Sequence, residues 1–229
     1  MTGELYHVYN RGVDKRLIFQ GEKDIQRFFL SMLEFNTIKS IGSIYEHSFS
    51  KSTNPKRSKK LVNFIAYCLN PNHFHFLLEQ VAEKGIEKFM QRLGTGYTNY
   101  FNNKYRRTGS LFQGTFKAVH IEKNEYLLHL SAYINLNNHV HKLGSEASKF
   151  VKTSWPEYEV STERKANNFC SKKIILGQFR SKGEYIKFAR SSLESILERR
   201  TELENLGEIL LEEPLGSEAS KWYQIKFLK

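Results

Sequence analysis

A single predicted β-hairpin organises the chain, and its sequence from residue 61 to residue 81 reads LVNFIAYCLNPNHFHFLLEQV. Residues 61–69 are almost continuously apolar, which is typical of a core strand. The sequence Asn-Pro-Asn at 70–72 favours a turn, and residues 73–81 form the partner strand. We place the other elements relative to this hairpin.

The second strand of the hairpin begins with two histidines on one face. Successive side chains of a strand point to opposite faces, so His73 and His75 project together while Phe74 and Phe76 point the other way. Two imidazoles on a rigid strand are suited to holding a divalent cation. A sheet surface that carries two histidines without any function has the same sequence pattern, so the interpretation depends on partners elsewhere in the chain.

The composition is that of a folded globular protein. The chain has 229 residues, of which 40% are hydrophobic and 14% aromatic, enough to bury a full core. No apolar run approaches the roughly 18 residues that cross a bilayer, and the first residues show no secretory signal. The two cysteines, Cys68 and Cys170, fit no zinc or disulfide spacing. We therefore expect a cytoplasmic protein with no membrane contact.

The net charge favours a polyanionic partner. The formal charge of +11 attracts polyanions, and nucleic acid is the main candidate. Basic residues crowd two segments, 51–60 and 104–107, whereas residues 194–213 are rich in acid. A basic protein without a nucleic-acid partner has the same charge, so charge alone does not decide the function.

The other elements follow from hydrophobic periodicity and turn residues. We expect further strands over 5–9, 41–49 and 111–121, and helices over 24–38, 85–105, 125–138 and 182–206. This order predicts an α+β protein with a ferredoxin-like, mostly antiparallel sheet, helices on one face, and a helical C-terminal extension. A seven-residue sequence, LGSEASK, occurs at 143–149 and again at 215–221, and we assign it no function.

The predicted helix over 125–138 carries the candidate partners of the two histidines. Tyr126, Leu130, Tyr133 and Asn137 are spaced by four, three and four residues, which places them on one helix face. The amide oxygen of Asn137 lies one turn from the Tyr133 hydroxyl. With the two imidazoles it makes a set of three neutral ligands, which suits Mg²⁺ or, because imidazole is present, more readily Mn²⁺.

Tyr133 is the candidate nucleophile of this constellation. A metal ion acts as a Lewis acid on a phosphate oxygen, and a tyrosine with an ordinary pKa near 10 needs such help to attack. The alternative for Tyr133 is an aromatic packed in the core. Tyr126 is the alternative nucleophile, but the residue four positions further on is Leu130, which offers no amide.

Four motifs occur in order along the chain: YHVYNRG at 6–12, AYCLNPNHFHFLL at 66–78, GSLFQGTFKA at 109–118, and YINLN at 133–137. Together they resemble the REP-associated tyrosine transposases of the single-tyrosine His-hydrophobic-His (HUH) superfamily, over roughly residues 4–190. The resemblance implies a catalytic domain at 1–142, with an insertion at about 41–60, and a partly helical extension at 143–229.

The resemblance also implies roles for particular residues. His73 and His75 are then metal ligands, Asn137 the third ligand, and Tyr133 the nucleophile. Such enzymes cut single-stranded or hairpin DNA with Mg²⁺ or Mn²⁺, leaving a 5′-phosphotyrosine and a free 3′-OH, and then rejoin strands. Relatives act as monomers or homodimers.

The basic residues add candidate DNA contacts, and two positions depart from the family pattern. The candidates for phosphate binding are Arg11, Lys104, Arg106, Arg107 and Lys117. Ordinary solvent-exposed charge explains each of them equally well. Asn138 stands where the family often has proline, and Thr115 stands where it commonly has arginine, which removes one expected phosphate contact.

Two other functions compete with this prediction. A nucleic-acid-binding regulator with the same fold and an inactive site has the same charge and sheet, although the complete set of His73, His75, Tyr133 and Asn137 argues against it. A nuclease that activates water usually gathers carboxylates around its metals, and no paired Asp/Glu cluster accompanies the histidines.

Overall fold

The computed structural model describes residues 1–49, 59–140, 150–159 and 169–205. The repeat at 143–149 and 215–221 and most of the basic segment 51–60 lie outside these ranges. No helix within them is long and apolar enough to cross a membrane.

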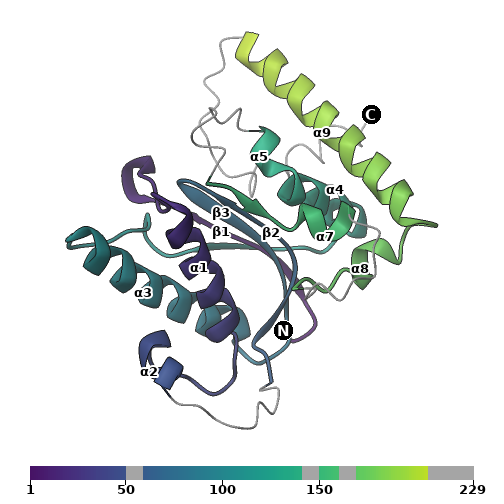
Figure 1. Cartoon of the computed structure of the whole chain (residues 1–229). Helices are drawn as coiled ribbons and strands as arrows, with labels where there is room; N and C mark the ends of the chain where they lie inside the picture. Colours follow the sequence, from purple (N-terminus) through teal and green to yellow (C-terminus); the bar gives the residue numbers. More distant parts are fainter. Residues whose placement is uncertain (50–58, 141–149, 160–168, 206–229) are drawn as a thin grey trace.

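A five-stranded antiparallel sheet forms the centre of the molecule (Figure 1). Its strand order is β4-β1-β3-β2-β5, and every neighbouring pair is antiparallel. The strands are β1 (Leu5–Arg11), β2 (Val62–Asn70), β3 (His73–Gln80), β4 (Lys117–His120) and β5 (Lys152–Thr153). The predicted hairpin is β2–β3, with Asn70 opposite His73 at the turn. The α+β class and the antiparallel sheet are confirmed.

Helices cover both faces of this sheet. On one face lie α1 (Glu22–Glu34) and α3 (Gly85–Tyr105), whose Phe28 and Phe89 pack with Phe76 of β3. On the opposite face lie α4 (Asn124–Asn135) and α9 (Lys182–Asn205) (Figure 1). The shorter helices are η1 (Val13–Lys15), α2 (Ile44–Phe49), α5 (Asn137–Val140), α7 (Trp155–Glu159) and α8 (Lys173–Leu176).

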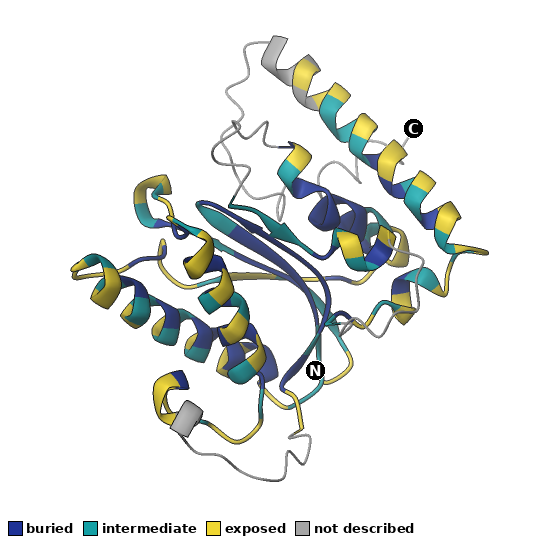
Figure 2. Ribbon diagram, in the orientation of Figure 1, coloured by how far each residue is buried: buried dark blue, intermediate teal, exposed yellow. Residues whose placement is uncertain are grey.

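The prediction of helices on one face describes α1 and α3 but not the second layer. The reason lies in β2, which is buried along nearly its whole length (Figure 2). A register shift between Phe64 and Ala66 interrupts the alternation of its side chains, so that Phe64 and Tyr67 join the core under α1 and α3. Ala66 and Cys68 join the core under α4. A strand that is apolar on both faces needs a cover on both faces.

Three expected elements differ from the structure. The strand expected over 41–49 is wrong, because α2 occupies its second half. Ser43 and Glu46 form a reciprocal capping box, in which the Glu46 backbone N–H donates to Ser43 Oγ and the Ser43 backbone N–H donates to Glu46 Oε2, both at 3.1 Å. The strand expected over 111–121 is limited to β4, preceded by an isolated bridge between Phe112 and Gly12.

The helix expected over 125–138 is interrupted. Leu136, with φ −111° and ψ 12°, separates α4 from α5. The preceding Asn135 uses its side chain elsewhere: its Oδ1 accepts a hydrogen bond from Ser154 Oγ at 2.6 Å and its Nδ2 donates to the Tyr185 hydroxyl at 2.9 Å. Asparagine is a poor helix former because its side chain competes for such bonds. These contacts tie α4 to α9 and to the segment after β5.

A buried carboxylate joins α1 to α3. Asp24 is fully buried and accepts hydrogen bonds from Lys104 Nζ at 2.5 Å, the Tyr105 hydroxyl at 2.7 Å, the Tyr100 hydroxyl at 3.2 Å and the Gln20 backbone N–H at 2.8 Å. Burial acts to raise the pKa of Asp24, but the hydrogen bonds from Lys104 and Tyr105 outweigh it and hold the pKa below its usual value of 3.8.

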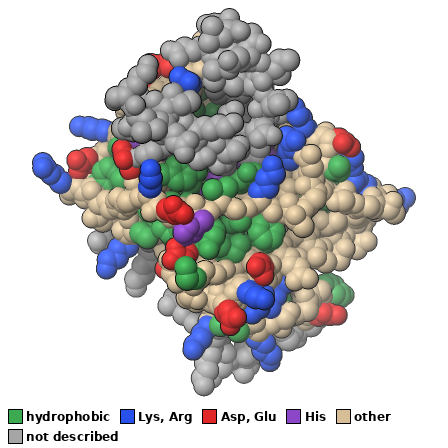
Figure 3. All heavy atoms as spheres, turned by 180° about the vertical axis from the view of Figure 1, so that it is seen from behind, with side chains coloured by type: hydrophobic (Ala, Val, Ile, Leu, Met, Phe, Trp, Pro, Cys, Tyr) green, Lys and Arg blue, Asp and Glu red, His purple; other side chains and the backbone are tan. Residues whose placement is uncertain are grey.

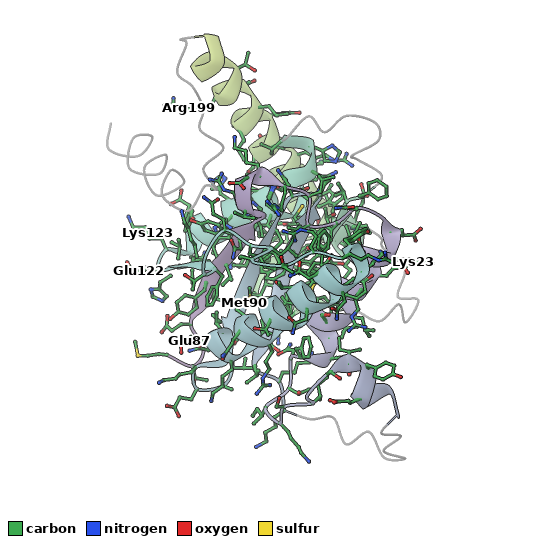
Figure 4. All side chains as sticks on the ribbon, turned by 90° about the vertical axis from the view of Figure 1, so that its left-hand side faces the viewer. Lys23, Glu87, Met90, Glu122, Lys123 and Arg199 are labelled. Atoms are coloured by element: carbon green, nitrogen blue, oxygen red, sulfur yellow. The ribbon has the colours of Figure 1, made fainter. Side chains whose placement is uncertain are left out.

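We expect Asp24→Asn to lower the free energy of unfolding at pH 7 by about 2–3 kcal/mol, because the variant leaves Lys104 without its buried partner. Chemical denaturation measures the loss. The stability from a lowered carboxyl pKa is present above the unfolded-state value and is lost as the pH falls below it, so the difference from wild type should shrink below about pH 3.8. Glu87→Gln, at an exposed position of α3 (Figure 4), is the control. An equal effect of both variants would contradict this role.

Candidate active site

The candidate site lies on the α4 face of the sheet, where the β2–β3 turn meets the end of β1. Residues directly opposite one another on neighbouring strands share a face of the sheet, so the strand register identifies the side chains that line the site. His73 lies between Arg11 of β1 and Asn70 of β2. His75, two residues further along β3, lies between Tyr9 of β1 and Cys68 of β2. Cys68 belongs to the core under α4, so the two histidines face that helix.

The two predicted histidines project on the same face. Their ring centroids are 5.2 Å apart, and the ring planes are nearly perpendicular at 83°. His73 is half-buried and His75 is buried. Each ring uses Nδ1 to contact a neighbouring side chain, and these contacts set which nitrogen is available for a ligand.

Asn72 fixes the tautomer of His73. Nδ1 of His73 lies 2.6 Å from Asn72 Oδ1, which only accepts, so Nδ1 carries the proton. In the neutral ring, Nε2 then has a lone pair. That lone pair accepts a hydrogen bond from Asn70 Nδ2 at 2.8 Å. His73 is therefore held in the tautomer that ligates a metal through Nε2.

His7 of β1 holds His75 in a similar way. His7 Nε2 lies 3.0 Å from His75 Nδ1, and the two rings stack with centroids 5.2 Å apart. Burial lowers the pKa of His7 to about 3, so this ring is neutral at pH 7 and retains a lone pair. When His7 accepts the Nδ1 proton of His75, the Nε2 lone pair of His75 is available to a ligand.

The helical layer brings Tyr133 and Asn137 to the same place. The Tyr133 ring packs edge-on against His75, with centroids 5.7 Å apart and an interplanar angle of 77°. Asn137 is the first residue of α5, and its Oδ1 accepts a hydrogen bond from Asn70 Nδ2 at 2.6 Å. The structure therefore brings together all four residues that the sequence selected, despite the break between α4 and α5.

Tyr126, the alternative nucleophile, is in a less favourable environment. Its hydroxyl is buried, and burial, with a smaller contribution from the nearby Tyr9, raises the pKa of Tyr126 to about 12. A higher pKa makes deprotonation before attack more costly. Tyr133, unlike Tyr126, lies against the candidate ligand His75, and this contact favours it as the nucleophile.

Only some of the predicted DNA contacts lie beside the site. Arg11, opposite His73, hydrogen-bonds to Gln113, and the exposed Lys117 lies opposite Tyr9 with its Nζ 6.0 Å from the centre of that ring. Lys104 lies on α3, across the sheet, and is paired with Asp24. Arg106 and Arg107 follow the end of α3. On the face seen in Figure 3, lysine and arginine side chains are spread out with acidic residues among them.

The donor set fits a divalent cation with open coordination positions. His73 Nε2 and Asn137 Oδ1 both point at one atom, Asn70 Nδ2, so their lone pairs converge. Within the described part of the chain, no cluster of three or more His, Cys, Asp or Glu side chains is arranged to hold a metal. A metal here therefore depends on two imidazoles and an amide oxygen, a neutral set that suits Mn²⁺ or Mg²⁺.

Three residues of this site are absent from the sequence-based set: His7, Asn70 and Asn72. His7 lies in the YHVYNRG motif, and strand alternation alone places it on the same face as Tyr9. Which strand lies beside β1, and in which register, is needed before His7 can be paired with His75. Asn70 and Asn72 were interpreted only as turn residues.

The site combines two histidines of an antiparallel sheet with a tyrosine and an asparagine from the helical layer. This is the arrangement expected of a single-tyrosine transposase. Residues 39–138 match the model of the family described as "Transposase IS200 like". This match confirms, over residues 39–138, the family resemblance indicated by the sequence motifs. The match includes the hairpin, Tyr133 and Asn137.

Comparison with individual proteins gives a fainter likeness. No curated protein matches the chain. A solved structure described as "Structure of the REP associates tyrosine transposase bound to a REP hairpin" aligns over 62% of this chain and 70% of that chain. The sequence identity is 12% and the TM-score is 0.45.

We expect His7→Phe to weaken Mn²⁺ binding about 10- to 100-fold, because His75 loses the partner that orients it. The substitution removes no charge, since the buried His7 is neutral. Titration of free Mn²⁺ by electron paramagnetic resonance measures the affinity without any need for activity. His129→Phe is the control: this partly buried ring also contacts a polar side chain, Ser192 at 3.1 Å, but between α4 and α9. A loss no greater than in the control would show that His7 does not position His75.

Proposed function

We propose that this protein is a transposase that acts as a metal-dependent single-strand DNA endonuclease and strand transferase, with Tyr133 as its nucleophile. One observation carries the proposal: Tyr133 packs against His75 while Asn70 joins His73 Nε2 to Asn137 Oδ1, so the nucleophile and all three candidate ligands meet at one place. The family match gives the reaction class, and the side-chain geometry suggests how the reaction proceeds.

The candidate ligands are His73, His75 and Asn137. These three residues would hold a divalent ion, which would supply Lewis-acid chemistry at a phosphate oxygen of the substrate. Asn72 and His7 contribute by accepting the Nδ1 proton of each imidazole, which leaves the Nε2 lone pair available to the ion.

Tyr133 carries out the covalent step. Its hydroxyl oxygen attacks the phosphorus, the new Tyr–O–P bond forms, and the bond from phosphorus to the 3′ oxygen breaks. The tyrosine loses a proton and the departing 3′ oxygen gains one, so the product is a 5′-phosphotyrosine and a 3′-OH. A 3′-OH then reverses the step and restores Tyr133. Because the phosphodiester energy is retained in the covalent intermediate, rejoining needs no nucleotide triphosphate.

The proposed substrate is single-stranded or hairpin DNA. The excess of positive charge favours binding of phosphates, and Arg11 and Lys117 are the two predicted contacts on the site's own sheet face. Phosphate contacts by these residues position the strand rather than read its sequence. The choice of a particular DNA sequence requires contacts to bases, which we do not assign.

We expect a labelled hairpin oligonucleotide incubated with the protein and Mn²⁺ to give a covalent, protein-sized band on a denaturing gel. The band should vanish with EDTA and in Tyr133→Phe, which removes only the attacking oxygen, and should persist in Tyr126→Phe. Cleavage without a covalent band would contradict the proposal in favour of a nuclease that activates water. Binding with neither would favour a regulator with an inactive site.

The proposed site is built within a single chain, since α4 packs on its own sheet and Tyr133 meets the His75 of the same chain. We therefore expect an equimolar mixture of His75→Ala and Tyr133→Phe proteins to stay inactive in the covalent-band assay. Recovery of about a quarter to a half of wild-type activity would show instead that the tyrosine of one copy serves the histidines of another. Wild type mixed with each variant is the control for dilution.

A further inference from the structure

Asn70 makes a contact that the proposed mechanism does not explain. It is the last residue of β2, it is fully buried, and its Nδ2 donates both to His73 Nε2 at 2.8 Å and to Asn137 Oδ1 at 2.6 Å. These two atoms are the ones proposed to hold the metal, so the inference rests on the proposed function. Asn70 itself is not among the proposed ligands.

The direction of these hydrogen bonds is settled by chemistry. The proton of His73 is on Nδ1, which donates to Asn72, so Nε2 accepts. The amide oxygen of Asn137 only accepts. The Asn70 amide therefore directs two partly positive N–H groups at two lone pairs, which is the electrostatic arrangement that a cation produces at the same atoms.

A metal ion and the Asn70 amide need the same two lone pairs. Neither Nε2 of His73 nor an amide-oxygen lone pair directed at the amide can serve both at once. We propose that Asn70 is an internal competitor for the metal: the amide satisfies His73 and Asn137 until an ion displaces it. Metal binding is thereby tied to a rearrangement at the end of β2, where the strand meets α5.

The surroundings of Asn70 permit this rearrangement. Its Oδ1 lies 3.5 Å from Cys68 Sγ, and a thiol both donates and accepts weak hydrogen bonds. The amide can therefore turn about its Cβ–Cγ bond and still face a tolerant neighbour. The two imidazoles keep contacts that do not involve Asn70, because Asn72 contacts His73 and His7 contacts His75. The backbone of Asn137 is held in α5, and its amide oxygen is the group that Asn70 releases.

The decisive variant is Asn70→Leu, which has similar length but no donor. Two hydrogen bonds, each a modest net contribution, no longer need to break, so Mn²⁺ should bind about tenfold more tightly than in wild type. The full chain and Mn²⁺ alone are used, with the bound fraction measured by electron paramagnetic resonance. Asn63→Leu is the matched control: Asn63 is also on β2, but its amide donates to Glu79 Oε2. Unchanged or weaker binding in Asn70→Leu overturns the inference.

A second measurement uses the wild-type chain and covers the case in which Asn70→Leu does not fold. In a ¹⁵N-labelled sample, saturating Mg²⁺ should shift the side-chain NH₂ signals of Asn70 and leave those of Asn63 in place. Unmoved Asn70 signals overturn the inference.

The double variant His73→Ala, His75→Ala separates this inference from the proposed function. If it binds Mn²⁺ as wild type does, the ion is held elsewhere, and the metal assignment fails together with the inference. If it loses binding, the ligand assignment stands, and the ratio of affinities between Asn70→Leu and wild type decides on Asn70 alone.

Discussion

The burial of β2 on both faces is the constraint on which the rest of the structure depends. A strand with apolar side chains on alternate faces gains its stabilisation only when both are covered, at roughly 25 cal/mol for each Å² of apolar surface removed from water. Phe64 requires the layer of α1 and α3, and Ala66 and Cys68 require α4. The first layer is a closed aromatic core. The second also delivers Tyr133 and Asn137 to the histidines, so a packing requirement brings the candidate site together.

The register of the hairpin then determines which residues face the second layer. With Asn70 opposite His73 and Cys68 opposite His75, the polar ends of both strands lie on the same side as α4. A slip of one residue would exchange His73 for Phe74 and bury an imidazole in the aromatic core, where it would lack hydrogen-bond partners. The apolar surface under α1 and α3 therefore also protects the arrangement of the site.

Much of this could be predicted from local pattern, and the failures have identifiable physical causes. The hairpin combines a long apolar run with a clear turn, and α3 is strongly periodic, so both were placed nearly to the residue. The α2 helix was missed because the prediction of a strand over 41–49 overlooked a local signal, the capping box of Ser43 with Glu46. The break at Leu136 depends on contacts of Asn135 with Ser154 and Tyr185, which are remote in sequence.

The candidate site shows the same difference between local patterns, which the sequence reveals, and contacts between residues remote in sequence, which it does not. His73 and His75 share a face by strand alternation, and Tyr133 and Asn137 share one by helical spacing, so each pair is visible locally. The two pairs meet because α4 covers the second face of the sheet. The residue spacing alone did not predict that position of α4, and the family resemblance was the support for joining the pairs. His7 and Asn70 act across strands, at separations of 68 and 67 residues from His75 and Asn137. No local pattern reports contacts of that range.

The charge of the site has a consequence for how substrate and metal bind. Imidazole and amide side chains bind a metal in their neutral forms, and the buried His7 beside them is neutral as well, because burial lowers its pKa to about 3. A divalent ion held by such a set keeps its full positive charge, which the protein leaves uncompensated. If the proposed substrate is bound, its phosphate supplies the missing negative charge, so phosphate and ion each favour the binding of the other. Competition from Asn70 works in the same direction, since an ion that binds weakly alone gains most from the phosphate. The site is therefore suited to assembling fully only when DNA is present.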